Sequence, residues 1–321
     1  MRRRGSGSLA LGSLLILAVG ASLVLPAGDE VPIIRVTTKL VMVPVSVSDS
    51  AGRSVSTLTL KDFVVDEDGQ RQNISHIADP GHVPLELALL VDVSGSVHGQ
   101  FELERQAAAR FLQRIVDPND TISLFSIGVR PRLVQEQTSQ LEIALRALQQ
   151  MERTRTTTAF FDTVSAAARS LRKTARPGAH RVVVALSDGE DNNSDHQTLT
   201  DALRELQQSD CLFYAINPGG TSIRLNRISL KAQQGLTTLA SQTGGAAFLV
   251  DRAGDLEGIF GQIAADLQSQ YLLGYQSTNS QSDGGFRRIT VRVVGRPDLT
   301  VRARHGYYPH RPDRSSQERS G

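Results

Sequence analysis

The sequence contains only one cysteine, Cys211, among its 321 residues. A chain with a single cysteine can form no intrachain disulfide and cannot build a cysteine-rich zinc site. Cys211 opens the apolar run 211–216, which is typical of a buried strand. We therefore interpret it as a buried structural thiol rather than a reactive one.

Net charge is also almost absent, because 35 basic and 33 acidic residues leave a formal charge of +2. No long basic run with interleaved aromatic residues occurs, so the sequence does not predict nucleic-acid binding. Hydrophobic residues make up 40% and charged residues 21%, which favours folded domains over disorder. The length is typical of about two domains.

Residues 1–27 have the pattern of an export signal. Arginines at positions 2–4 precede an apolar stretch over 9–26, and small residues at 18–20 and near 27 offer cleavage positions. We predict a cleaved signal peptide, with a retained N-terminal anchor as the alternative because the stretch approaches the minimum length of a membrane span. Either outcome exports the remainder to the periplasm, the cell surface or the medium, and a membrane contact is expected only if this segment is not cleaved.

The remaining chain shows three kinds of pattern. Residues 30–80 and 271–309 contain short segments rich in β-branched residues, separated by turns. Residues 83–270 alternate strand and helix patterns, and the run 85–91 is almost continuously apolar, as in a strand covered on both faces. The polar tail 310–321 is predicted to be disordered.

These patterns predict an α/β fold in which residues 83–270 form a doubly wound, mostly parallel sheet. Each flanking β segment is too small to bury a core alone. We expect the N-terminal and C-terminal segments to pack together as one all-β sandwich, with the α/β domain inserted between them. In doubly wound sheets, ligands bind beyond the carboxyl ends of the strands, so the chemistry is expected there.

The same patterns give element boundaries. In the α/β part we predict strands at 85–91, 121–127, 181–186, 211–216 and 246–250, and helices at 101–116, 140–151, 160–173, 199–208, 231–243 and 256–270. In the flanking parts we predict strands within 33–49 and at 63–66, 72–77, 271–276, 286–294 and 300–304.

Oxygen-bearing side chains gather after two of the predicted strands, 85–91 and 181–186, and before a helix between them in the chain. They are Asp92, Ser94 and Ser96 after the first strand, Thr158 before the helix, and Asp188 after the second strand. Hydroxyls and carboxylates without histidine or cysteine suit Mg²⁺, with Mn²⁺ and Ca²⁺ as alternatives, rather than zinc. With few carboxylates directly on the ion, an acidic side chain of a partner can fill an open coordination position.

Taken together, these residues resemble the metal-ion-dependent adhesion site (MIDAS) of von Willebrand factor type A (VWA) domains. The resemblance is carried by Asp92-x-Ser94-x-Ser96, Thr158-Ala159-Phe160-Phe161-Asp162 and Ser187-Asp188-Gly189. Most of the chain also resembles exported proteins with a VWA-related domain that are common in acidobacteria, through the leader, the segments 49–53 and 63–69, and the ending 271–308. That resemblance implies export and the same three-part layout, but it supplies no known ligand.

The resemblance to the adhesion site implies a role for each residue. Ser94 and Ser96 bind the metal directly, and Thr158 binds it directly when a ligand is engaged and through water otherwise. Asp92 and Asp188 hold the metal mostly through water and orient the hydroxyls. Glycines often precede the threonine in such sites, whereas this chain has two further threonines there, which predicts a stiffer loop.

Neighbouring polar residues have plainer interpretations. Glu190 and Asp191 fit a solvated loop, and His98 fits a solvated helix start. Asp162 is expected to brace the threonine loop rather than to contact metal.

We predict a non-enzymatic adhesion or assembly module that engages an acidic group on a protein partner through the metal. Ser94 and Ser96 do not lie in a Gly-x-Ser-x-Gly elbow, and no histidine has a placed partner, so the sequence shows no nucleophile–base set. A metal-dependent phosphohydrolase is one alternative, although a phosphate-binding lysine is not evident. A structural module of the same fold that does not use metal is the other.

Overall fold

The computed structural model describes residues 40–78, 83–94, 101–154, 156–176, 178–219, 227–250, 255–281 and 283–309. The predicted leader and polar tail, together with Ser96 and His98, lie outside the described residues. Among the helices that are described, none is both long enough and apolar enough to cross a membrane.

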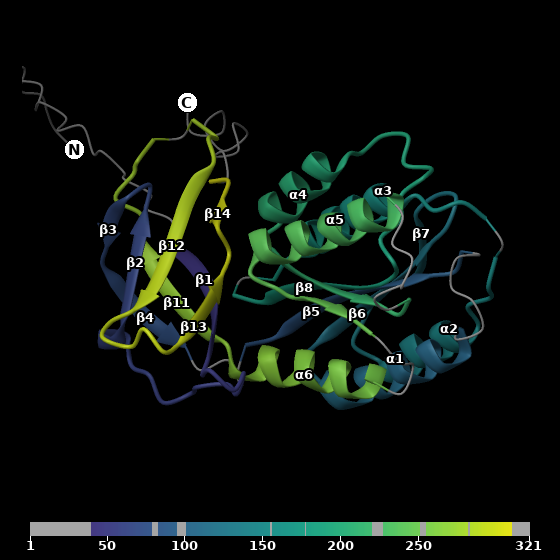
Figure 1. Ribbon diagram of the computed structural model, residues 1–321, viewed down its shortest axis with the longest axis horizontal. Coiled ribbons are helices and arrows are strands. Elements are labelled where there is room, and N and C mark those ends of the chain that lie inside the picture. Colours follow the sequence, from purple (N-terminus) through teal and green to yellow (C-terminus); the bar gives the residue numbers. More distant parts are fainter. Residues whose placement is uncertain are drawn as a thin grey trace, which may run out of the picture. The chain divides into compact units, whose positions relative to one another are not determined.

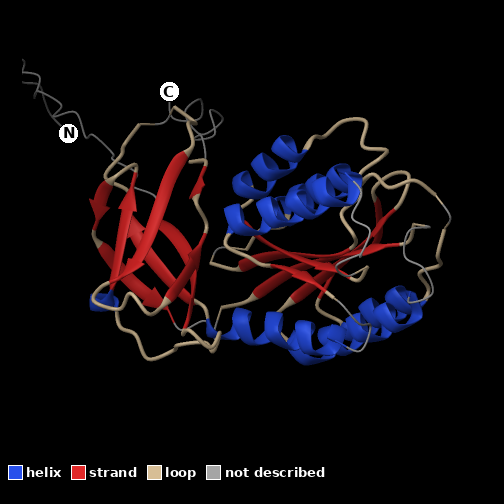
Figure 2. Cartoon of the chain, in the orientation of Figure 1, coloured by secondary structure: helices blue, strands red, loops and turns tan. Residues whose placement is uncertain are grey.

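A six-stranded sheet forms the centre of the α/β part (Figures 1 and 2). In spatial order its strands are β10 (Ala247–Leu249), β9 (Cys211–Asn217), β8 (His180–Leu186), β5 (Leu85–Asp92), β6 (Thr121–Ile127) and β7 (Arg132–Thr138). All neighbouring pairs are parallel except β6 and β7, which are antiparallel. The chain continues from β5 to β6 on one side and later enters β8 on the other, so the β5–β8 boundary is the topological switch point.

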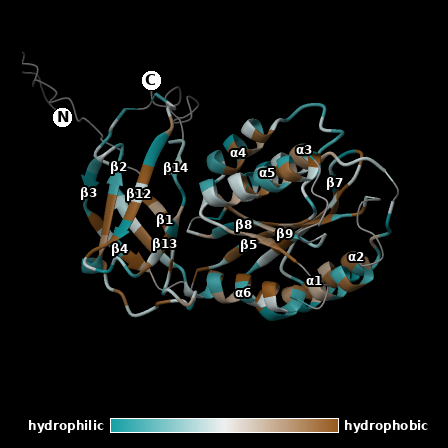
Figure 3. Cartoon of the chain, in the orientation of Figure 1, coloured by the Kyte–Doolittle hydropathy of each residue, from teal (hydrophilic) through white to brown (hydrophobic). Residues whose placement is uncertain are grey.

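Helices cover both faces of this sheet (Figure 1). One face packs against α1 (Phe101–Ile115), α2 (Leu141–Gln149) and α6 (Leu256–Ser269), and the other against α3 (Phe160–Lys173), α4 (Leu199–Gln208) and α5 (Arg227–Thr243). Alternate side chains of β5 serve the two cores, Leu87 and Leu89 on one face and Ala88 and Leu90 on the other. This double burial explains why the central strands are mostly apolar, as their colours in Figure 3 show.

The flanking segments form two four-stranded antiparallel sheets with the orders β13-β1-β11-β4 and β14-β12-β2-β3. Their strands are β1 (Leu40–Ser48), β2 (Phe63–Glu67), β3 (Gln70–Gln72), β4 (Ile74–Ala78), β11 (Tyr271–Gln276), β12 (Arg287–Val293), β13 (Thr300–Ala303) and β14 (Gly306–Tyr307), and a short 3₁₀ helix, η1 (Leu60–Asp62), precedes β2. Both sheets combine strands from the N-terminal and C-terminal segments, since β1 pairs with β11 and β12 pairs with β2. Residues of both sheets share one apolar core.

A single residue, Gln270, links α6 to β11. It is 1% exposed, and its side-chain amide donates to the hydroxyls of Ser46 (3.1 Å) and Tyr214 (3.0 Å). Asp266 of α6 accepts a hydrogen bond from Tyr214 (2.5 Å) and forms an ion pair with Arg302 of β13. Buried polar contacts therefore fix the end of the last helix where the second half of the sandwich begins.

The predicted fold class is confirmed, since a mostly parallel, helix-covered sheet accompanies antiparallel sheets built from both flanking segments. The single return strand predicted at 72–77 is wrong. The chain leaves β3 at Gln72 and crosses to the other sheet, where β4 pairs with β11. The edge strand β7 was not predicted, because none of its residues is buried and its sequence shows no clear apolar alternation.

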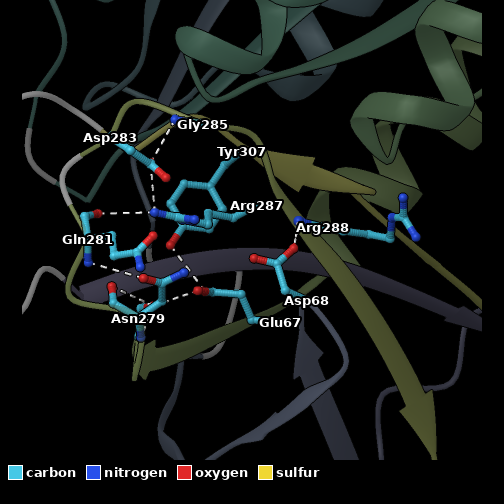
Figure 4. Close-up of polar contacts among 10 residues, drawn as sticks. Glu67, Asp68, Asn279, Gln281, Asp283, Gly285, Arg287, Arg288 and Tyr307 are labelled. Atoms are coloured by element: carbon cyan, nitrogen blue, oxygen red, sulfur yellow. Dashed lines mark hydrogen bonds and ion pairs between the residues drawn. The ribbon is translucent and has the colours of Figure 1, made fainter.

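A buried carboxylate organises one end of the sandwich (Figure 4). Glu67, 2% exposed, accepts hydrogen bonds from the hydroxyls of Tyr275 (2.7 Å), Tyr307 (3.1 Å) and Ser277 (2.6 Å). Burial and the neighbouring Glu67 carboxylate raise the pKa of Tyr307 to about 12, so this tyrosine remains a donor at neutral pH. Glu67 thereby joins β2 to β11 and β14 and stabilises the sandwich.

The close packing of the chain after α5 against β9 can be tested by substitution. Helix α5 ends at Thr243, and a Cβ on Gly245 would overlap the backbone carbonyl of Phe213 in β9. We expect Gly245→Ala to lower the free energy of unfolding by about 2–3 kcal/mol, because the backbone must move to make room. The matched control is Gly258→Ala in α6, where a Cβ meets nothing within 4 Å and should stabilise by up to about 1 kcal/mol. Urea denaturation measures both, and equal effects would contradict the packing described for β9.

Candidate functional site

Asp92, the last residue of β5, is held by hydrogen bonds from two loops. It is 0% exposed, and its Oδ1 accepts from the backbone NH of Ser94 (2.9 Å) while its Oδ2 accepts from the hydroxyl of Ser187 (2.7 Å). Ser187 directly follows β8, and Val91 lies opposite Leu186 in the sheet. The pairing of β5 with β8 therefore brings together the loops that follow them, and the Ser187 hydroxyl fixes the Asp92 carboxylate between them.

Asp188 lies in a tight loop that requires Gly189. The Oγ of Ser187 accepts from the NH of Gly189 (3.1 Å), and Oδ1 of Asp188 accepts from the NH of Glu190 (3.0 Å). Gly189 has φ of +76°, and a Cβ there would lie 2.6–2.9 Å from side-chain atoms of Leu236. Glycine tolerates both the left-handed backbone and the close approach, so the chain can turn sharply directly after Asp188.

Thr158 is buried in a loop that forms hydrogen bonds with the loops that carry Asp92 and Asp188. Its NH donates to the side-chain oxygen of Asn192 (2.8 Å), and its carbonyl accepts from the NH groups of Asn192 (3.1 Å) and Asn193 (3.0 Å). Earlier in the same loop, the NH and the hydroxyl of Thr154 both donate to the carbonyl of Val93 (2.6 and 3.0 Å). Backbone contacts therefore hold the threonine loop against the loops that carry Asp92 and Asp188.

Asp191 has a structural role that the solvated-loop interpretation missed. Its Oδ1 accepts from the NH groups of Phe160 (2.8 Å) and Phe161 (3.3 Å) and from the hydroxyl of Ser194 (2.5 Å). Asp191 thus caps α3, whose own N-cap residue, Ala159, has no side-chain acceptor. The missing local cap is the one sequence signal that pointed to a distant acceptor.

Asp162 braces a different loop from the one expected. Its Oδ2 accepts from the NH of Asp195 (3.2 Å), and its own NH donates to the hydroxyl of Ser194 (3.1 Å). These contacts hold residues 194–195 in the loop after β8. The loop after β8, which carries Asp188, is therefore supported by the first turn of α3.

The edge of the sheet concentrates negative charge. Burial raises the pKa of Asp92, hydrogen bonds from Ser187 and Ser94 partly offset this, and the charge of Asp188 raises it further. Burial also raises the pKa of Glu190, again with a contribution from Asp188. A cluster of negative charge that raises the pKa of Asp92 and Glu190 favours a bound cation.

Glu104 was not among the residues predicted for the site; it lies in the first turn of α1 and is 1% exposed. Neither of its carboxylate oxygens has a hydrogen-bond partner among the described residues. Burial, then the charges of Asp92 and Asp188, raise its pKa to about 7, while the charge of Arg153 acts in the opposite direction. In the sequence this residue looked like an ordinary acidic residue at a helix start, where the helix dipole favours negative charge.

The structure brings Asp92, Ser94, Thr158 and Asp188 to one edge of the sheet, and Ser96 lies outside the described residues. Among the described residues, no three or more His, Cys, Asp or Glu side chains form a metal-binding group. A site built from hydroxyls and two carboxylates requires no such group, and its oxygen donors fit a hard divalent cation. The buried, mutually repelling carboxylates supply the charge that such a cation would balance.

The position of Glu104 generates a pH prediction. In the metal-free protein its folded-state pKa of about 7 lies above the ordinary value of 4.5, so its ionisation opposes folding as pH rises. Relative to Glu104→Gln, the wild type should lose on the order of 3 kcal/mol of unfolding free energy between pH 4.5 and 7. Below pH 4.5 and above pH 7 the difference between the two proteins should stay constant. His180, whose pKa burial lowers to about 4, is present in both proteins and cancels.

Denaturation in the presence of chelator across this pH range measures the difference. The control is Glu102→Gln, because Glu102 lies on the same helix, is exposed and pairs with Arg105. The pKa of Glu102 is lowered by that pairing, so its effect should vanish only as pH falls below 4.5. If the difference in unfolding free energy between the wild type and Glu104→Gln does not change between pH 5 and 7, the burial of Glu104 is contradicted.

Several solved structures are similar to this chain, including these three. Proximal thread matrix protein 1 from the mussel byssus, in a form with a zinc-occupied MIDAS motif, is 16% identical, with a TM-score of 0.50 over 63% of this chain and 49% of that one. BatB from Bacteroides thetaiotaomicron is 18% identical, with a TM-score of 0.46 over 58% of this chain and 100% of that one. The vWF domain of the type V pili tip protein Mfa5 from Porphyromonas gingivalis is 12% identical, with a TM-score of 0.46 over 57% of this chain and 94% of that one.

No curated protein matches the chain significantly. The family model of the von Willebrand factor type A domain matches residues 86–262, from the second residue of β5 into α6, and so spans more than half of the chain. The doubly wound, mostly parallel sheet is the fold that the sequence patterns predicted. The chain belongs to the von Willebrand factor type A domain family.

Proposed function

We propose that the chain is an exported protein-binding module that holds a divalent cation and uses it to bind an acidic group on a protein partner. The cation, Mg²⁺ in the first place, is held by Asp92, Ser94, Ser96, Thr158 and Asp188. The observation that carries the proposal is the convergence of three loops at the switch point, joined by the Ser187–Asp92 hydrogen bond of 2.7 Å.

The contacts of these residues support distinct roles. Both oxygens of Asp92 already accept hydrogen bonds from Ser94 and Ser187, so this carboxylate acts on the cation best through water. The hydroxyls of Ser94 and Ser96 bind the cation directly, and Thr158 joins them when a ligand is engaged. When bound, the cation supplies a positive centre with a position open to a partner's carboxylate.

Hard oxygen donors favour Mg²⁺, Mn²⁺ or Ca²⁺ in this site. The mussel protein of similar fold has zinc in its MIDAS motif, so zinc belongs among the ions to be compared. A binding role is favoured over phosphoryl transfer, because the sequence offers no evident phosphate-binding lysine for the charge of a transferring phosphoryl group. Export is supported by the arginine-led apolar stretch at residues 2–26.

The first prediction concerns the cation. Asp92→Asn and Asp188→Asn should each weaken Mg²⁺ and Mn²⁺ binding by about tenfold or more, because groups that orient metal-bound water contribute that much. Isothermal titration calorimetry on the chain without its leader measures the affinities, with circular dichroism to verify folding. Asp195→Asn is the matched control, since Asp195 is an exposed residue of the same loop whose backbone NH makes its contact with Asp162.

Binding of one ion that is weakened in both variants and unchanged in the control supports the metal site. A wild type that binds no divalent ion at millimolar concentration would overturn it and leave a structural module.

The second prediction concerns the partner. On an array of short peptides, those captured in Mg²⁺ and released by chelator should contain Asp or Glu, and changing that residue to Asn or Gln should abolish capture. The reason is that only a charged carboxylate completes the coordination of the cation. Capture that survives chelation, or that is indifferent to the acidic residue, would contradict a metal-bridged contact.

A further inference from the structure

Glu104 lies on the buried face of helix α1, which is otherwise apolar. The buried face of α1 consists of Glu104, Ala107, Ala108, Phe111, Leu112 and Ile115, and Glu104 is its one charged member. A buried carboxylate without hydrogen bonds costs stability, and an apolar side chain at this position would not. Its presence therefore calls for a partner that the described residues do not provide.

The helix start alone does not account for the burial. The N-terminal end of a helix favours acidic side chains in its first turn, but that effect acts on exposed groups as well. Glu102 lies in the same turn and is exposed, with an ion pair to Arg105. Glu104 instead is buried, and neither of its carboxylate oxygens has a hydrogen-bond partner in the part of the chain that the structure describes.

The buried face of α1, on which Glu104 lies, packs against the core that contains β5, and three charges act on Glu104 there. From β5 it is influenced by Asp92, from the loop after β8 by Asp188, and from the chain after α2 by Arg153. The two aspartates are residues of the proposed metal site. Among the described residues, Glu104, Asp92 and Asp188 do not form a group that could hold a metal directly, so a role for Glu104 through metal-bound water fits better than direct coordination.

We propose that Glu104 is an additional anionic residue of the metal centre, which acts on the cation through its bound water and thereby raises the affinity for divalent ions. This inference rests on the metal site proposed above and adds to it a residue outside its sequence motif. A carboxylate behind the ion balances its charge without occupying the position open to a partner. Arg153 limits the excess negative charge that the third carboxylate brings.

The test is the affinity for Mn²⁺ and Mg²⁺ of Glu104→Gln, measured by calorimetry between pH 5.5 and 8.5. At pH 8 we expect a loss of about tenfold or more relative to wild type, as for other groups that orient metal-bound water. The wild-type affinity should rise with pH more steeply than that of the variant, because a charged Glu104 is what the cation requires. Glu104→Asp should recover part of the loss, and Glu102→Gln is the control on the same helix.

Metal-free stability separates this role from a structural one. Glu104→Gln should be at least as stable as wild type in chelator at pH 8, since it removes an uncompensated buried charge. A variant that binds metal within twofold of wild type, or that loses affinity only because it is unfolded in chelator, would overturn the inference and leave the metal site standing. A wild type that binds no divalent ion would overturn both.

Discussion

The parallel pairing of β5 with β8 is the constraint on which the candidate site depends. These strands are buried on both faces, so their register is fixed by two hydrophobic cores at once. That register sets Asp92 beside Ser187, and the 2.7 Å hydrogen bond between them joins the two loops. The threonine loop then docks on both through backbone groups, so core packing carries the geometry of the site.

Sequence periodicity predicted the parts of the fold in which burial is uniform. The strands β5, β8 and β9 were recognisable because they are almost continuously apolar, and the helices α3 and α4 because their apolar residues recur at helical spacing. The edge strand β7 and the sheet change after Gln72 were not, because exposed strands and crossings between sheets leave no such repeat. Pairing of the flanking segments was predictable because neither could bury a core alone.

The candidate site was predictable where its residues belong to a local motif and not where they act across the fold. Asp92 and Ser94 follow one strand and Asp188 another, so topology alone placed them at one edge. Asp191 caps α3 from a distant loop, and Glu104 is buried by packing of α1, and neither role has a local signature. A site that concentrates negative charge at a buried edge sacrifices stability in the metal-free state, which a bound cation would restore.

Anomalous diffraction from crystals of the chain soaked in Mn²⁺ would show whether a divalent cation binds where the three loops meet. Data collected at the manganese absorption edge locate the ion independently of any assumption about its ligands. If the proposed metal site is correct, one anomalous peak will lie at the carboxyl edge of the central sheet, among Asp92, Ser94, Thr158 and Asp188. A peak elsewhere in the molecule, or none at a concentration that saturates binding in solution, would contradict it.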